Sequence, residues 1–175
     1  MMTRRTTGFT LVELITAVAI LFMLVAVAIP TFSSILADWR LTRAVDRVAA
    51  DLRYVQSQAV TRGGLFRFHH GDDVGQPGKY RLEQSTDGGA SWVAMPDQPM
   101  WTALSDVYQG SSLQSFKDND GAGTSRHWVA FNSQGAADTT GISAAFVYPL
   151  RVTVVAQGGA TREIRVVRTG AVRVL

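Results

Sequence analysis

An apolar run near the N-terminus limits this chain to a narrow class of structures. From Phe9 to Ile29 it covers 21 residues, in which Glu13 is the one charged side chain, and Pro30 follows it. A helix of this length spans about 30 Å, the thickness of the hydrocarbon core of a bilayer. The run can therefore cross a membrane once.

The residues ahead of the run indicate how the chain would lie in a membrane. Residues 1–8 carry Arg4 and Arg5 and no acid. Since positive charge favours the cytoplasmic side, we expect a cytoplasmic N-terminus and a periplasmic C-terminal part. The expected location is the inner membrane, crossed once.

A small-residue junction stands before the apolar run, whereas an ordinary secretory signal is cut after its apolar segment. Cleavage between Gly8 and Phe9 would keep the apolar helix and create a new amine at Phe9. The sequence Gly-Phe-Thr-Leu-Val-Glu from Gly8 to Glu13, with Pro30 beyond it, resembles the class III signal of type IV pilins and pseudopilins. This resemblance implies that a prepilin peptidase removes residues 1–8 and methylates Phe9.

Glu13 is an acid inside an apolar helix. Such a charge costs roughly 2.5 to 3.5 kcal/mol near the bilayer centre and less near the interface. The resemblance implies that Glu13 meets the N-terminal amine of a neighbouring subunit and sets the register of a filament core. The alternative is that its carboxylate reaches the cytoplasmic headgroups.

The composition is consistent with one exported domain beyond the membrane helix. The chain has 175 residues, a length that predicts one globular domain past the apolar run. It has no cysteine, which excludes disulfides, cysteine-based metal sites and a thiol nucleophile. Removal of residues 1–8 would leave 15 Lys and Arg residues against 14 Asp and Glu residues, so net charge favours no particular partner.

Helical spacing continues past Pro30. Apolar residues recur at steps of mostly three or four, at Phe32, Ile35, Leu36, Trp39, Val45, Val48, Leu52, Val55 and Ala59. The pattern predicts a helix from about Phe9 to Arg62, ended by Gly63 and Gly64. Pro30 lacks a backbone donor, so a kink or a local loss of helix is expected there.

From Leu65 onward the apolar period changes to two, which predicts a β-domain. The predicted strands are Leu65–His69, Tyr80–Gln84, Trp92–Met95, Trp128–Phe131, Ala144–Leu150, Arg151–Ala156, Arg162–Val167 and Val172–Leu175. Residues 96–124 are polar, and one or two edge strands with loops are expected there. The chain thus divides into a leader (1–8), a membrane or filament-core helix (9–29), an amphipathic continuation (30–62) and a periplasmic β-domain (63–175).

Two further patches are similar to the GspH/FimT family of minor pilins and pseudopilins. One is the helix end at residues 52–63, and the other combines residues 129–135 with residues 165–173. The resemblance implies an α+β fold, in which a long N-terminal helix packs on an antiparallel two-sheet β-domain.

Residues 85–92, Ser-Thr-Asp-Gly-Gly-Ala-Ser-Trp, fit the Asp-box pattern of sialidase propellers. In that pattern Asp and Gly shape a hairpin turn, and Trp packs beneath it. A propeller needs many repeats, and only one copy is present here. A single hairpin is the prediction.

Asp118-Asn119-Asp120-Gly121 matches the start of an EF-hand loop. The twelfth position of that loop needs a bidentate acid, and it is occupied by Val129. A polar turn is therefore the favoured interpretation, and a calcium loop is the minor alternative.

The histidines favour neither catalysis nor metal binding on sequence grounds. His69 and His70 are adjacent, so in a strand they point to opposite faces and do not readily share one ion. His127 is far away in sequence, and no nucleophile motif accompanies any of the three. We interpret them as surface or strand-edge residues, and we expect no metal, no cofactor and no enzymatic activity.

The C-terminal strands carry a basic group of residues. Arg151, Arg162, Arg165, Arg168 and Arg173 face a single acid, Glu163. Some FimT-like proteins bind DNA through a Gly-Arg-x-Arg motif near this end, and residues 170–173 keep only its glycine and its last arginine, Arg173. DNA binding through Arg162, Arg165, Arg168 and Arg173 is one hypothesis, and a solvated hairpin face is the favoured alternative.

Together these patterns predict a minor pilin of a type IV pilus that primes or caps filament assembly. Its expected partners are the prepilin peptidase, other pilins and an inner-membrane assembly platform. A GspH-like pseudopilin of a type II secretion system and a DNA-binding pilin for transformation are the two alternatives.

Overall fold

The computed structural model describes residues 9–114, 116–117, 127–138 and 148–175. It consists of two units, divided between Leu36 and Ala37. Helix α1 (Leu11–Arg62) contributes to both, and the second unit contains all of the strands.

Both ends of α1 are set by local sequence. At the start, the backbone N–H of Glu13 donates a 3.2 Å hydrogen bond to the hydroxyl of Thr10, the geometry of an N-cap. At the end, Gly63 adopts a left-handed φ of 66°, and the N–H of Gly64 donates to the carbonyl of Ala59 over 3.2 Å. This is the glycine-capped ending that the sequence predicts.

The helix continues through Pro30 without interruption. The expected local loss of helix is therefore wrong, because a missing proline donor removes one hydrogen bond without ending a helix that continues on both sides. A kink at this position stays a prediction.

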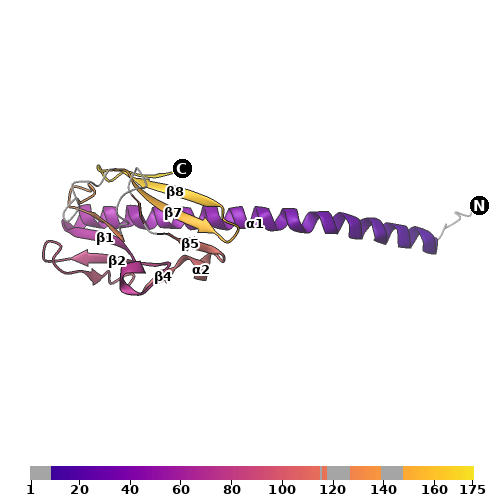
Figure 1. Ribbon diagram of the computed structural model, residues 1–175, viewed down its shortest axis with the longest axis horizontal. Coiled ribbons are helices and arrows are strands. Elements are labelled where there is room, and N and C mark those ends of the chain that lie inside the picture. Colours follow the sequence, from indigo (N-terminus) through magenta and orange to yellow (C-terminus); the bar gives the residue numbers. More distant parts are fainter. Residues whose placement is uncertain (1–8, 115, 118–126, 139–147) are drawn as a thin grey trace, which may run out of the picture. The chain divides into compact units, whose positions relative to one another are not determined.

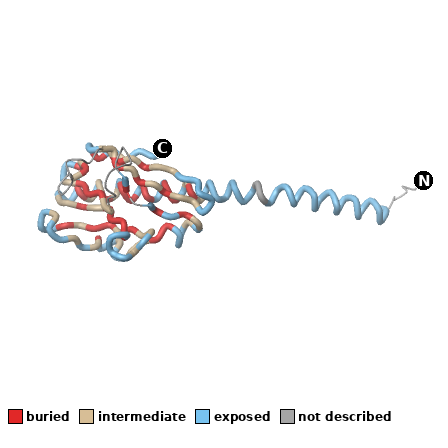
Figure 2. Tube along the Cα trace, in the orientation of Figure 1, coloured by how far each residue is buried: buried red, intermediate tan, exposed pale blue. Residues whose placement is uncertain are grey.

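The second part of α1 supplies one wall of the core. Its buried apolar side chains recur every three or four residues, twice as adjacent pairs: Leu41, Ala44, Val45, Val48, Ala49, Leu52, Val55 and Ala59. Figure 2 shows this stretch as a run of buried positions. The predicted stripe is thus confirmed from Val45 onward, whereas Trp39 is exposed.

In the described part of the second unit, the strands form two antiparallel sheets. The first has the order β3-β2-β1-β6, and β4 also pairs with β2. The second has the order β5-β7-β8-β9. In the first sheet the strands are β1 (Leu65–His70), β2 (Lys79–Ser85), β3 (Val93–Ala94), β4 (Thr102–Ala103) and β6 (Trp128–Phe131). In the second they are β5 (Ser111–Leu113), β7 (Leu150–Ala156), β8 (Thr161–Val166) and β9 (Val172–Val174).

Most predicted strands are confirmed to within one or two residues. Most of the separate strand expected at Ala144–Leu150 lies outside the described residues, and of its described part only Leu150 is in a strand, where it opens β7. The 96–124 region contains β4, a helical turn α2 (Leu104–Val107) and β5 in its described part. The turn η1 (Gly71–Val74) joins β1 to β2.

Helix and sheets share one hydrophobic core, which confirms the predicted α+β fold. Residues of α1, of β1, β2 and β6, and of β7 and β8 all belong to one buried cluster. In Figure 1, β1 and β2 lie to one side of the last part of α1 and β8 lies to the other.

A buried polar contact fixes the helix against the first sheet. The hydroxyl of Tyr80 donates a 2.6 Å hydrogen bond to Asp51, which also accepts a 3.0 Å bond from Arg47. Burial first, and then the charge of Asp51, raises the pKa of Tyr80 well above its ordinary value. The ring of Tyr80 stacks on Phe68 at 4.6 Å between ring centres.

Candidate functional site

The first part of α1 presents an apolar surface with no cover from the described chain. Every described side chain from Phe9 to Ile29 is exposed, and Phe9 itself is 83% exposed. An 18-residue window of the helix has a mean hydropathy of 2.7, enough to cross a membrane by length and composition. A surface of this kind needs lipid or other protein around it.

Glu13 lies in the first turn of this helix, where the positive end of the helix dipole favours an acid. Its carbonyl accepts a 3.0 Å hydrogen bond from the hydroxyl of Thr16. Gly8 lies outside the described residues. The processing of Gly8 and Phe9 and the register role of Glu13 stay predictions, since each needs a second protein.

The predicted arginine group is only partly assembled. Arg151 lies opposite Arg165, and Arg165 lies opposite Arg173, so these three form a row across β7, β8 and β9. Glu163 interrupts this row, because it pairs with Arg165 at 3.2 Å and with Arg151 at 3.6 Å.

The other two arginines differ in their surroundings. Arg162 precedes Arg165 by three residues in β8, where it lies opposite Val154, and it pairs with Asp38 of α1 at 3.1 Å. Arg168 lies exposed in the turn between β8 and β9. Among the described residues, Arg168 and Arg173 form no ion pair, so they are the cations of the group that an anion could reach.

The predicted hairpin at residues 85–92 is confirmed between β2 and β3. Asp87 accepts hydrogen bonds from the backbone N–H of Ser91 at 2.8 Å and from the hydroxyl of Ser85 at 2.7 Å. The hydrogen bonds from Ser91 and then Ser85 hold the pKa of Asp87 well below its ordinary value. Gly88 and Gly89 have φ values of 73° and 98°, which only glycine adopts readily.

A second polar cluster, which sequence analysis missed, lies on the first sheet around Glu83. This side chain is 1% exposed and accepts hydrogen bonds from Arg67 at 2.5 Å, Arg81 at 2.9 Å and His69 at 3.2 Å. Burial would raise the pKa of Glu83, but the hydrogen bonds from His69 and Arg81 and the charge of Arg67 lower it to about 2.

Tryptophan rings cover this cluster. The guanidinium of Arg67 lies 4.3 Å from the ring centre of Trp92, and that of Arg81 lies 4.6 Å from the ring centre of Trp101. Trp101 also packs edge-on against His69 at 5.4 Å. The cluster is therefore a closed, internally paired structure that leaves little room for a substrate.

The interpretation of the histidines as surface or strand-edge residues is wrong for two of them. His69 is 4% exposed and His70 is fully buried. Their opposite orientations are as expected: His69 faces Glu83, whereas His70 faces Asp72 at 3.3 Å. Burial lowers the pKa of His70. His127 is half-buried.

The fold and the uncovered apolar helix define the pilin-like class of membrane-anchored subunits. The prokaryotic N-terminal methylation motif matches residues 3–29, and the family model of type II transport protein GspH matches residues 44–170. The chain therefore belongs to the GspH family. It is a structural subunit of the minor pilin or pseudopilin type and not an enzyme.

Two solved structures illustrate the similarity of fold. The minor pseudopilin EpsH from the type 2 secretion system of Vibrio cholerae superposes with a TM-score of 0.54 at 16% identity, over 78% of this chain and 96% of that chain. The type IV minor pilin FimU of Pseudomonas aeruginosa gives a TM-score of 0.52 at 12% identity, over 77% of this chain and 87% of that chain. No sequence among the curated proteins matches this chain.

Proposed function

We propose that the chain is a minor pilin of a type IV pilus, a structural subunit that helps to prime or cap filament assembly. The observation that supports this is an uncovered apolar helix that carries Glu13 near its start and lies within an N-terminal methylation motif. In this proposal, prepilin peptidase removes residues 1–8 and methylates Phe9. The mature subunit then contacts other pilins and the inner-membrane assembly platform.

Before assembly, the subunit crosses the inner membrane once. Arg4 and Arg5 keep the N-terminus cytoplasmic, and residues 63–175 fold in the periplasm. Entry into a filament then exchanges lipid around residues 9–29 for the apolar helices of neighbouring subunits.

Glu13 sets the alignment of the subunit with its neighbours as it enters the filament. A carboxylate in an apolar helix is costly wherever it has no partner, and a neighbouring N-terminal ammonium at Phe9 would supply one. A buried pair of this kind is sensitive to the loss of either partner, so misaligned subunits are disfavoured.

The Glu13→Val variant tests the assembly role. We expect it to be processed and retained in the membrane but to enter filaments at less than a tenth of the normal level, measured by immunoblotting of sheared filaments. Thr16→Val, which makes a similar polar-to-apolar change one turn further along the helix, is the matched control and should assemble normally. Normal incorporation of Glu13→Val would refute the register role.

A minor pseudopilin of a type II secretion system is the second candidate, and the match to the GspH family model favours it. Cross-linking in cells that carry a tagged copy, followed by mass spectrometry of the attached proteins, separates the two. Recovery of pilus subunits supports the proposal, and recovery of secretion pseudopilins replaces it with the second candidate.

A DNA-binding minor pilin is the third candidate, and exposed Arg168 and Arg173 favour it. If it holds, Arg165→Ala combined with Arg168→Ala should abolish retention on duplex DNA without affecting filament assembly, since clustered cations dominate phosphate binding. Arg40→Ala with Arg43→Ala removes the same charge from α1 and should retain DNA. Retention by the Arg165 and Arg168 double variant at low salt would exclude this candidate.

A further inference from the structure

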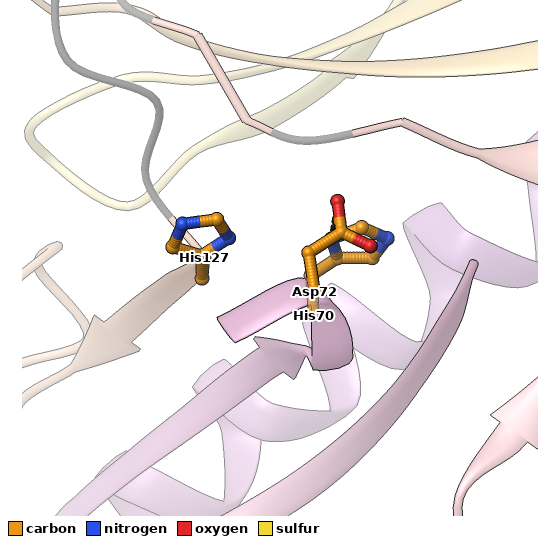
Figure 3. Close-up of side chains that lie close together, drawn as sticks. All are labelled: His70, Asp72 and His127. Carbon is orange, nitrogen blue, oxygen red and sulfur yellow. Dashed lines mark ion pairs between the residues drawn. The ribbon is translucent and has the colours of Figure 1, made fainter. Parts of the chain in front are cut away.

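Three side chains from two distant places in the sequence meet at one end of the first sheet. His70 ends β1, Asp72 lies in η1, and His127 directly precedes β6. The N–H of His70 donates a 2.5 Å hydrogen bond to the carbonyl of His127, which extends the β1–β6 pairing by one residue beyond His69 and Trp128. Opposed residues of an antiparallel pair point to the same face, so the two imidazoles lie on one side, where Figure 3 also shows Asp72.

The spacing of these side chains suits a metal ion. One ligand atom from each of His70, Asp72 and His127 lies within 4.8 Å of the others. The Nδ1 atom of His70 lies 3.3 Å from Oδ2 of Asp72. A tetrahedral zinc centre, with bonds of about 2.0–2.1 Å, separates its ligand atoms by about 3.3 Å. Exposed Asp72 and half-buried His127 have room for the remaining adjustment.

The imidazoles also lack the hydrogen bonds that buried histidines normally form. Within the described residues, neither ring nitrogen of fully buried His70 forms a hydrogen bond of ordinary geometry, and Nδ1 of His127 forms none. The backbone of Leu113 and the carboxylate of Asp72 nevertheless lie near the His70 ring and favour its charged form. The 3.3 Å approach to Asp72 does not have hydrogen-bond geometry. Adjacent His69, in contrast, contacts Glu83 through Nδ1 and Asp73 through Nε2. Unpaired buried nitrogens are uncommon and point to a missing partner.

We propose that His70, Asp72 and His127 bind a divalent transition-metal ion of the zinc type. Two imidazoles and one carboxylate match the ligands that Zn²⁺ prefers, and tetrahedral coordination leaves a fourth position for water beside exposed Asp72. Ca²⁺ and Mg²⁺ are disfavoured, since both take oxygen ligands almost exclusively. The site needs no cysteine, which this chain lacks.

A metal here would act as a structural clip. It would join the end of β1 and the turn η1 to the residue before β6, which are separated by more than 50 residues in sequence. Metal binding to the folded state alone stabilises that state. This role is independent of which filament the subunit enters.

The test uses the mature full-length chain in detergent, purified with a tag that contains no histidine. Zn²⁺ is titrated in competition with a chromophoric chelator, and the thermal midpoint is measured with and without Zn²⁺. We expect saturable binding of one ion per chain and a rise in the midpoint. Co²⁺ in place of Zn²⁺ should give the visible absorption bands of a tetrahedral site.

Two neighbouring acids provide a matched pair of variants. Asp72→Asn and Asp73→Asn each remove one carboxylate from the same turn, but Asp73 contacts His69 instead of the proposed site. We expect Asp72→Asn to weaken Zn²⁺ binding at least tenfold and to lose the Co²⁺ bands. Asp73→Asn should bind within twofold of the unaltered chain.

His127→Ala provides a second, independent variant, because its half-buried ring can be removed with less damage to the core than that of His70. It should abolish the binding of one ion per chain while its circular dichroism spectrum stays unchanged. Absence of saturable binding by the unaltered chain would overturn the proposal, and so would equal weakening by Asp72→Asn and Asp73→Asn.

Discussion

The hydroxyl of Tyr80 makes the buried polar contact between the first sheet and α1. It donates to buried Asp51, so Tyr80→Phe would leave that carboxylate with Arg47 as its remaining partner. We expect a loss of about 1–3 kcal/mol in the free energy of unfolding, measured by urea denaturation in detergent.

The matched control for Tyr80→Phe is Tyr54→Phe. The hydroxyl of Tyr54 donates a 2.8 Å hydrogen bond to Asp97, but this contact is exposed and water can replace it. We expect a loss of less than about 1 kcal/mol. Equal losses in the two variants would mean that the buried hydrogen bond to Asp51 stabilises the fold no more than the exposed hydrogen bond to Asp97 does.

Glu83 should make stability depend on pH in the acid range. Its pKa falls from an ordinary 4.5 to about 2 in the folded state, so its contribution is complete above pH 4.5 and is lost as the pH falls toward 2. Thermal midpoints measured from pH 5 to pH 2 should fall more steeply for the unaltered chain than for Glu83→Gln. Parallel curves of thermal midpoint against pH for the two proteins would show that Glu83 does not cause the pH dependence, since the other acids titrate equally in both.

At the residue scale, the sequence predicts those features that depend only on a short stretch of neighbouring residues. The glycine cap at Gly63 and the turn around Asp87 follow from one short stretch each, and both are confirmed. The burial of His69 and His70 could not be predicted, because it depends on partners such as Trp101 and His127 that are distant in sequence. Arg67 and His69 stand two residues apart in β1, and Arg81 and Glu83 stand two residues apart in β2. This spacing puts each pair on one face of its strand, and it was the sequence signal available for the Glu83 cluster.

At the element scale, the turn between β8 and β9 relies on Gly170. Its φ is 91°, and an added Cβ would overlap the carbonyl oxygen of Gly135. That carbonyl also accepts a 2.7 Å hydrogen bond from Gln56 of α1. Gly170→Ala should therefore displace both the turn and its contact with the helix, at a cost above about 2 kcal/mol.

Gly159→Ala is the control for this steric effect. Gly159 has a similar φ of 82° in the turn between β7 and β8, but an added Cβ would meet nothing within 4 Å. We expect only the backbone strain, about 1–2 kcal/mol, in the same denaturation experiment. A Gly170→Ala variant no less stable than Gly159→Ala would show that the contact with Gly135 is unimportant.

The elements themselves were predictable where the apolar period was long or regular. The period of α1 located its buried face and its end, and alternation located β1, β2, β6 and β8. The short strands β4 and β5 carry too few residues for a period to develop, so their positions depend on pairing with β2 and β7. The division into two antiparallel sheets was implied only by family resemblance, and the order of the strands within each sheet was not predicted, since strand pairing is decided by contacts across the whole domain.

At the scale of the whole molecule, the division between Leu36 and Ala37 separates an exposed apolar helical segment from the unit that contains the buried core. Every residue of the buried hydrophobic cluster lies at position 41 or later, whereas the described residues before position 37 are exposed. A chain that begins at Ala37 keeps the complete cluster and the Tyr80–Asp51 contact. It should therefore be soluble without detergent and should unfold in one cooperative thermal transition. The full chain should precipitate when detergent is withdrawn, because residues 9–29 keep their apolar surface. Size-exclusion chromatography and circular dichroism check both outcomes, and an unfolded or detergent-dependent 37–175 fragment would show that the first unit is needed for the fold.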